Sequence, residues 1–270
     1  MVRYYVVVLF GEANFEKIEN FFLNIHVSSN NTIVFVQNKE GCNFPKVKDS
    51  FNVRGDNNLR EFGGYDKAVS YIEREFIVKN NDILILMNDT IFKSYNLIAK
   101  VLNNGVANLC IIENNKNLAI VPVFIEVGDI NIFDTKMDRL FATFFMAMRY
   151  DLMKKIGGML AEIHYEKYLS SEYSEKLFIN PNTPEYNNFY NNWMGCGKPS
   201  GVGNWWASSA IPFNSNNFYF LRAKAQMILL ETSFSVRLKQ NNVEVFDLYR
   251  RSHFIQILRI IRQRIQRYLK

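Results

Sequence analysis

A short polar tripeptide follows an apolar run that has the composition of a buried strand. The run spans residues 83–87, and Asn88, Asp89 and Thr90 come directly after it. One carboxylate beside amide and hydroxyl oxygens could contribute to a ligand site. The competing interpretation is that Asp89 only caps a helix that begins at Ile91.

A second candidate carboxylate, Glu231, follows another apolar run. The residues after it, 233–238, place Phe234 and Leu238 one helical turn apart. This pattern predicts that Glu231 lies at the start of a helix, where the macrodipole would hold it ionised. An ionised carboxylate at a crevice can act as a general base. The alternative is a helix-terminal acid with no catalytic task.

A glycine-rich stretch, residues 195–204, could form a binding loop flanked by Trp193, Trp205 and Trp206. It is not a phosphate-binding P-loop, because Lys198 is not followed by Ser or Thr. Aromatic rings beside a polar loop suit stacking on sugars. The alternative is an ordinary surface loop whose tryptophans belong to the core. The whole segment 180–212 is predicted to be a long functional loop.

The first half of the chain alternates strand and helix signals. Strands are predicted over residues 3–10, 31–38, 50–56, 82–87, 108–114 and 118–127, and helices over residues 14–26, 63–77 and 91–104. Asn14 is the predicted N-cap of the first helix. Such alternation indicates an α/β fold with a mostly parallel sheet, whose ligands bind at the carboxyl ends of the strands. The tripeptide, Gln37 and Asn38, and residues 54–56 all fall at that edge.

The second half is predicted to differ from the first. Residues 136–178 read as continuous helix, with residues 140–148 as a buried helix and a break at Gly157 and Gly158. The sequence therefore predicts helical and loop elaborations after residue 130.

Composition and charge narrow the class of protein. The chain has 270 residues, a net charge of +6 and three cysteines, Cys42, Cys110 and Cys196, without metal-ligand spacing. A disulfide framework or zinc site is not expected. No stretch approaches eighteen consecutive apolar residues, so no transmembrane helix is expected.

Much of the positive charge lies in residues 250–270. Apolar residues recur there at helical spacing, and basic residues, including Arg259, Arg262, Arg264 and Arg267, occupy the remaining positions. This pattern predicts a basic amphipathic helix lying on a membrane surface rich in anionic lipid. The alternatives are a final helix packed on the body of the protein and a DNA-binding helix, although no helix-turn-helix pattern accompanies it.

Three stretches in order resemble the GT-A glycosyltransferases of the large inverting family that builds bacterial surface polysaccharides. They are RGDNNLREFGGYDKAVSYI (54–72), DILILMNDT (82–90) and NFYFLRAKAQMILLETSFSVRL (217–238). With the amino-terminal strands, the resemblance covers most of residues 3–245. The chain departs from the family pattern in offering a single carboxylate after the central strand, and in having Thr232 where many relatives have Asp.

The resemblance implies a nucleotide-sugar donor and a set of site residues. Donor contacts would come from Gln37, Asn38, Arg54, Asn57, Asn58, Gly64, Asn88, Asp89 and Thr90. Asp89, with or without Mg²⁺ or Mn²⁺, would orient the donor diphosphate, and Glu231 would take the proton of the acceptor hydroxyl with inversion at the sugar. Trp193, Lys198, Trp205, Trp206 and Arg222 would lie on the acceptor side.

The resemblance also implies an organisation and a cellular setting. Residues 1–249 would form a GT-A-like (Rossmann-like) domain, with a nucleotide-sugar-binding half (1–130) and an acceptor-side half (131–249), followed by the membrane-associating helix. The enzyme would be cytoplasmic, peripheral at the inner face of the cell membrane, and would extend lipid-linked or oligosaccharide acceptors in capsule or O-antigen (lipopolysaccharide) assembly. Two alternatives stay open: a catalytically degenerate scaffold of such an assembly complex, and a basic nucleic-acid-binding protein, although nucleic acid is not expected as a partner.

Overall fold

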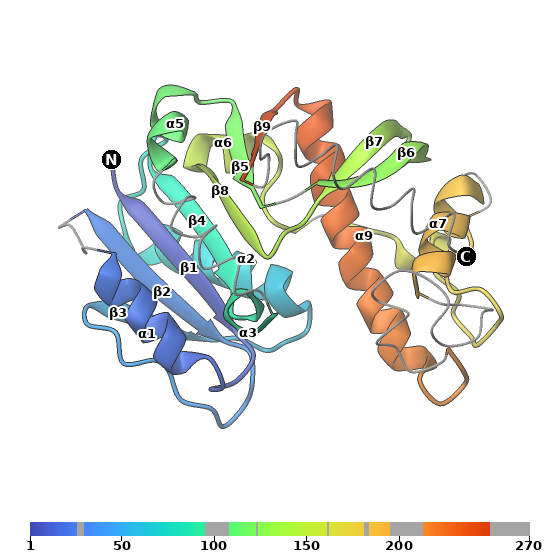
Figure 1. Ribbon diagram of the computed structural model, residues 1–270, viewed down its shortest axis with the longest axis horizontal. Coiled ribbons are helices and arrows are strands. Elements are labelled where there is room, and N and C mark those ends of the chain that lie inside the picture. Colours follow the sequence, from blue (N-terminus) through green and yellow to red (C-terminus); the bar gives the residue numbers. More distant parts are fainter. Residues whose placement is uncertain are drawn as a thin grey trace, which may run out of the picture.

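A computed structural model of the protein describes residues 1–25, 30–94, 108–122, 124–160, 162–180, 184–194 and 213–248. This part of the chain is an α/β structure with a seven-stranded, mostly parallel sheet flanked by helices, together with a separate two-stranded hairpin (Figure 1). The fold is compatible with a Rossmann-like arrangement.

The sheet has the strand order β3-β2-β1-β4-β8-β5-β9. The strands are β1 (Arg3–Leu9), β2 (Asn31–Gln37), β3 (Ser50–Arg54), β4 (Ile83–Asn88), β5 (Leu118–Val121), β8 (Phe145–Arg149) and β9 (Glu244–Asp247). All run parallel except β8, which pairs antiparallel with both β4 and β5. The central strands are buried on both faces, which explains why they read as continuous apolar runs and not as alternating ones.

Two hydrophobic cores cover the two faces of the sheet. On one face, Tyr4, Val6 and Val8 of β1 pack with α2 (Arg60–Glu75), α6 (Tyr150–Lys155) and part of α9 (Phe218–Gln240). On the other face, Tyr5, Val7 and Leu9 pack with α1 (Phe15–Asn24), α3 (Thr90–Ser94) and α5 (Leu109–Asn114). The alternation of β1 side chains between the two cores is the two-residue period of a strand.

A third core lies on the far side of α9. It joins the hairpin of β6 (Phe124–Ile132) and β7 (Thr135–Phe141), the segment around the short 3₁₀ helix η1 (Tyr165–Lys167), and α7 (Pro184–Met194). Figure 1 shows α9 in orange, running between the sheet and this hairpin. Leu230 and Phe234 of α9 pack into the core of the sheet, whereas Leu221 and Leu229 pack into the third core. The helix therefore has apolar side chains on opposite sides.

The structure confirms the strands predicted within 3–10, 31–38, 50–56 and 82–87 and the helices predicted within 14–26 and 63–77. Of the helix predicted over 91–104, the described part is α3. As predicted, the helix before Gly157 and Gly158 ends there, and both glycines have positive φ, 85° and 82°. Asn14 precedes α1, but it makes no side-chain cap bond to the helix.

Other predictions are wrong. Residues 108–114 contain the helix α5, residues 118–127 contain parts of two strands, and the segment 180–212 contains the helix α7. The region predicted as continuous helix, 136–178, begins with strands β7 and β8. Residues 145–148 are all buried, so this run has no alternation that could distinguish a strand from a buried helix. No helix within the described residues is long and apolar enough to cross a membrane.

Candidate functional site

The carboxyl ends of β1, β2, β3 and β4 meet at one edge of the sheet, because these four strands are parallel neighbours. Asn88 is the last residue of β4, and Thr90 begins α3. The Asn88 side-chain oxygen Oδ1 accepts hydrogen bonds from the backbone N–H of Thr90 (3.2 Å) and from its hydroxyl. Asn88 therefore holds the first turn of α3.

Asp89 connects β4 to the loop that follows β1. Its Oδ2 accepts a hydrogen bond from the backbone N–H of Phe10 (3.0 Å), and its carbonyl accepts one from Nδ2 of Asn14 (3.0 Å). Its own N–H donates to the carbonyl of Val8 (2.9 Å). Asp89 is 5% exposed. The carboxylate is thus positioned at the strand ends by contacts with β1 and its following loop.

Glu231 lies in the middle of α9, so the prediction that it begins a helix is wrong. Its Oε1 accepts hydrogen bonds from both the backbone N–H (2.9 Å) and the hydroxyl (3.0 Å) of Thr143, in the connection between β7 and β8. The macrodipole of a helix falls off within its end turns and has little effect here. Instead, Thr143 holds one carboxylate oxygen against the edge of the sheet.

The environment of Glu231 raises its pKa, whereas the sequence predicted an acid held ionised. Burial is the largest cause and the charge of Glu61 the second, and together they raise the pKa of Glu231 to about 7, although the two hydrogen bonds from Thr143 lower it. A carboxyl group with a pKa near neutrality can both accept and release a proton at physiological pH. This is the property required of a general base or acid.

Two residues of α2, Glu61 and Tyr65, complete a group with Asp89, Glu231 and Thr143, which we name the carboxylate cluster. Glu61 lies in the first turn of α2, and burial raises its pKa. One turn later, the Tyr65 hydroxyl donates to the carbonyl of Thr143 (3.2 Å). Burial raises the pKa of Tyr65 well above its usual value, and the charges of Glu61, Glu231 and Asp89 add to this. Three carboxylates from different elements therefore act on one buried, protonated tyrosine.

Thr232, next to Glu231, points into a different environment. It is 1% exposed, and its hydroxyl forms hydrogen bonds with the hydroxyl of Tyr190 (2.8 Å) and the carbonyl of Ile228 (2.7 Å). Tyr190 belongs to the third core. Of the pair Glu231 and Thr232, it is Glu231 that faces the edge of the sheet.

Gln37 and Asn38, predicted to contact a donor, are buried at the end of β2. Gln37 holds the loop after β2, because its Nε2 donates to the carbonyl of Asn43 (2.9 Å) and its Oε1 accepts from the N–H of Lys39 (3.1 Å). Asn38 Nδ2 donates to the carbonyl of Arg60 (2.8 Å). Its Oδ1 is buried without a hydrogen-bond partner among the described residues, and it fills the space that a Cβ at Gly55 would need.

The other predicted donor residues have local contacts as well. Arg54 donates to the carbonyl of Cys42 (2.5 Å), and its guanidinium lies 4.6 Å from the centre of the Phe44 ring. Asn57 has positive φ (58°), and the N–H of Asn58 donates to Asp56 Oδ1 (3.0 Å). Donor binding by these residues stays a prediction.

Gly64 has a packing role. A Cβ at Gly64 would lie 2.7 Å from both γ-carbons of Val8, so the glycine allows α2 to approach β1 closely. Packing against Val8 is sufficient to explain why residue 64 is a glycine. The predicted contact of Gly64 with a donor stays a prediction.

The acceptor-side predictions are only partly within the described residues. Arg222, on α9, donates from Nε to the carbonyl of Ser170 (2.9 Å) and so holds the segment that follows η1. Trp193 belongs to α7. Lys198, Trp205 and Trp206, and the basic tail with Arg259, Arg262, Arg264 and Arg267, lie outside the described residues.

A metal at Asp89 would find few protein ligands. The residues that the structure describes contain no group of three His, Cys, Asp or Glu side chains able to hold an ion. A divalent cation there would need diphosphate oxygens and waters for most of its coordination shell.

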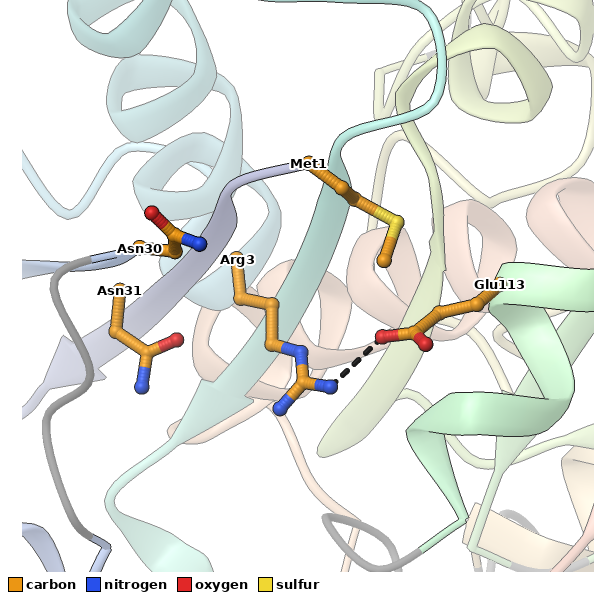
Figure 2. Close-up of a pocket in the computed structure, with 5 residues that line it drawn as sticks. All are labelled: Met1, Arg3, Asn30, Asn31 and Glu113. Carbon is orange, nitrogen blue, oxygen red and sulfur yellow. Dashed lines mark hydrogen bonds and ion pairs between the residues drawn. The ribbon is translucent and has the colours of Figure 1, made fainter.

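A separate hollow lies at the opposite, amino-terminal edge of the sheet. It has a volume of about 340 Å³ and is lined by Met1, Arg3, Asn30, Asn31 and Glu113 (Figure 2). Arg3 Nη2 and Glu113 Oε1 are 2.7 Å apart and form an ion pair across it. This hollow is distinct from the carboxylate cluster at the carboxyl edge.

Sequence reasoning missed Glu61, Tyr65 and Thr143. The helix was predicted over residues 63–77, which includes Tyr65 but begins two residues after Glu61. A helix that begins at Arg60, as α2 does, places the two residues one turn apart. Thr143 carried no signal, since its surroundings were predicted as helix. A comparison of the sequence with known protein families finds no match, and a comparison with curated proteins finds none either.

Proposed function

We propose that the protein is an inverting glycosyltransferase of the GT-A type, which transfers a sugar from a nucleotide-sugar donor to a hydroxyl of a glycan acceptor. One observation carries this proposal: the carboxyl group of Glu231, held by Thr143 and with a pKa of about 7, belongs to the same cluster as Asp89 at the ligand-binding edge of an α/β sheet. The sequence resemblance supports the same two residues.

In the proposed reaction the donor diphosphate lies across the strand ends near Asp89. The acceptor hydroxyl oxygen attacks the anomeric carbon from the face opposite the diphosphate. As the new C–O bond forms, the old one breaks, and the nucleoside diphosphate leaves with its electron pair. Thr143 holds Oε1 of Glu231, and the hydroxyl proton passes to the other carboxylate oxygen.

A divalent cation bound with the donor would offset the negative charge of the leaving diphosphate. Asp89 is the residue that would hold it. Because the described residues supply no cluster of three ligands, the metal would arrive with the donor and would not occupy a preformed protein cage.

The proposal includes an acceptor on a lipid carrier in capsule or O-antigen assembly. Sequence alone supports this part, since residues 250–270 combine an apolar stripe with basic residues. Such a helix would bring the enzyme to its acceptor at the inner face of the cell membrane.

A second candidate is a scaffold that keeps the fold but catalyses no transfer. The position of Asp89 favours it, because this carboxylate is 5% exposed and already accepts a hydrogen bond from Phe10. A scaffold predicts that donors bind weakly or not at all and that no sugar is released or transferred.

Thermal unfolding with a panel of UDP-, GDP-, dTDP- and CMP-sugars, with and without Mn²⁺, tests the proposal. A donor present at ten times its Kd adds about 1.4 kcal/mol to the free energy of unfolding. We expect one nucleotide class to raise the Tm of the wild type, and Asp89→Asn to remove most of that rise. Glu231→Gln should still bind the donor but lose transfer and donor hydrolysis.

Asp82→Asn is the matched control for Asp89→Asn. Asp82 lies just before β4 and, like Asp89, accepts hydrogen bonds from backbone N–H groups, those of Val2 (2.7 Å) and Lys79 (2.8 Å). It lies at the amino-terminal edge, so its replacement should lower stability without changing the donor-induced rise in Tm. A flat panel would contradict the transferase, and donor binding without turnover would favour the scaffold.

A further inference from the structure

Two basic side chains from distant parts of the sequence meet beside the carboxylate cluster. Arg60 begins α2, and Lys224 lies in the first half of α9. The ring of Phe220 is close to both: the Arg60 guanidinium carbon is 6.0 Å and Lys224 Nζ 5.7 Å from its centroid. Phe220 is 49% exposed, so this group, which we name the Arg60–Lys224 pair, borders solvent.

The fold holds these two positive charges together despite their repulsion. Burial lowers the pKa of Lys224, the charge of Arg60 lowers it further, and the charge of Glu61 raises it. Glu61 carries one negative charge beside these two positive charges. Two cationic side chains that the fold holds this close together attract an anion.

The pair lies in line with Glu231 along α9. Phe220, Lys224 and Glu231 are spaced by four and seven residues, which places them on one face of the helix. At 1.5 Å per residue, Lys224 and Glu231 are about 10 Å apart along the helix axis. A single sugar ring spans roughly half of that distance, so a sugar phosphate can reach from one to the other.

The charge of Glu61 acts on both Lys224 and Glu231, so the pair borders the cluster that contains the proposed base. The charge of Asp89 acts on Tyr65, which belongs to the same cluster. Lys224 lies toward the amino-terminal end of α9 from Glu231. Arg60 lies at the carboxyl edge of the sheet, where its carbonyl accepts a hydrogen bond from Asn38 Nδ2 (2.8 Å).

We infer that Arg60 and Lys224 bind a phosphate group of the acceptor, so that the acceptor is a sugar phosphate or diphosphate and not a neutral oligosaccharide. This inference rests on the proposed transferase function, because only a transferase has an acceptor. Phosphate oxygens would accept charge-assisted hydrogen bonds from the guanidinium and the ammonium groups. The acceptor hydroxyl would then lie one sugar ring away, next to Glu231.

Calorimetric titration with glucose 1-phosphate, inorganic pyrophosphate and neutral methyl glucoside tests this inference without requiring turnover. We expect the wild type to bind the two anions and not the neutral glycoside. Arg60→Met and Lys224→Met keep an aliphatic stem but remove the charge, and each should weaken anion binding at least tenfold. Lys224→Arg keeps the charge and should retain binding, which separates lost charge from lost folding.

Lys116→Met, an exposed lysine before β5, is the control for the general effect of removing one positive charge, and it should bind the anions like the wild type. Equal anion binding by all variants, or none by the wild type, would overturn the inference. If Arg60→Met and Lys224→Met instead weaken binding of the nucleoside diphosphate, the pair belongs to the donor site and the acceptor assignment is wrong.

The two proposals fail in different ways. If the wild type does not bind glucose 1-phosphate but responds to the nucleotide-sugar panel, the phosphate site alone is refuted. A flat nucleotide-sugar panel, with glucose 1-phosphate binding that still depends on Arg60 and Lys224, would refute the transferase and the acceptor role but leave an anion site standing.

Discussion

Replacing Glu231 by Gln should remove a large part of the pH dependence of stability. The pKa of Glu231 is about 7 in the folded protein, against an ordinary value of 4.5. Below pH 4.5 the group is protonated in both the folded and unfolded states, and its contribution to stability is full. As the pH rises toward 7, the unfolded state ionises first and the folded state loses stability relative to it.

The magnitude follows from the two pKa values. A tenfold difference in proton affinity corresponds to about 1.4 kcal/mol, so a pKa that moves from 4.5 to about 7 corresponds to about 3 kcal/mol. About 2.5 kcal/mol of this is lost between pH 5 and pH 8. The free energy of unfolding of Glu231→Gln minus that of the wild type should rise by that amount over the same interval.

Urea unfolding at pH 5, 6, 7 and 8 measures this difference, and subtraction cancels the titration of groups common to both proteins. Glu185→Gln, at an exposed position in α7, is the control and should follow the wild type at every pH. In a Glu61→Gln background the rise should be smaller, because the charge of Glu61 is the second cause of the raised pKa. A difference that stays constant from pH 5 to pH 8 would refute the reasoning.

Three further substitutions test the surroundings of the site. Thr143→Val removes one donor to Glu231 and should cost about 1 kcal/mol, raise the pKa of Glu231 further and move the pH–rate profile to higher pH. Gly64→Ala forces a Cβ against Val8 and should lower the free energy of unfolding by about 1–3 kcal/mol, seen as a lower urea midpoint. Thr232→Val breaks a buried hydrogen bond in the third core and should lower the free energy of unfolding by about 1 kcal/mol while leaving kcat unchanged. A loss of kcat would contradict the assignment of Glu231 as the base.

The sequence by itself determined the parallel half of the sheet and the position of the polar tripeptide. Strands β1, β2 and β4 are apolar runs buried on both faces, and α1 and α2 have one apolar face each, so the pattern of each element shows its type locally. Because parallel strands end at one edge, the placement of Asn88, Asp89 and Thr90 at the carboxyl edge of the sheet followed without further information.

Only the tertiary structure determined the secondary structure of the second half of the chain and the pKa of Glu231. Residues 145–148 are buried on every side, and such a run reads the same in a strand and in a buried helix until its partner, β4, is known. The apolar sides of α9 pack against two different cores, so Glu231 is in the middle of a long helix. Its pKa depends on burial and on Glu61 and Thr143, which are distant in sequence, and local residue patterns contain no information about such neighbours.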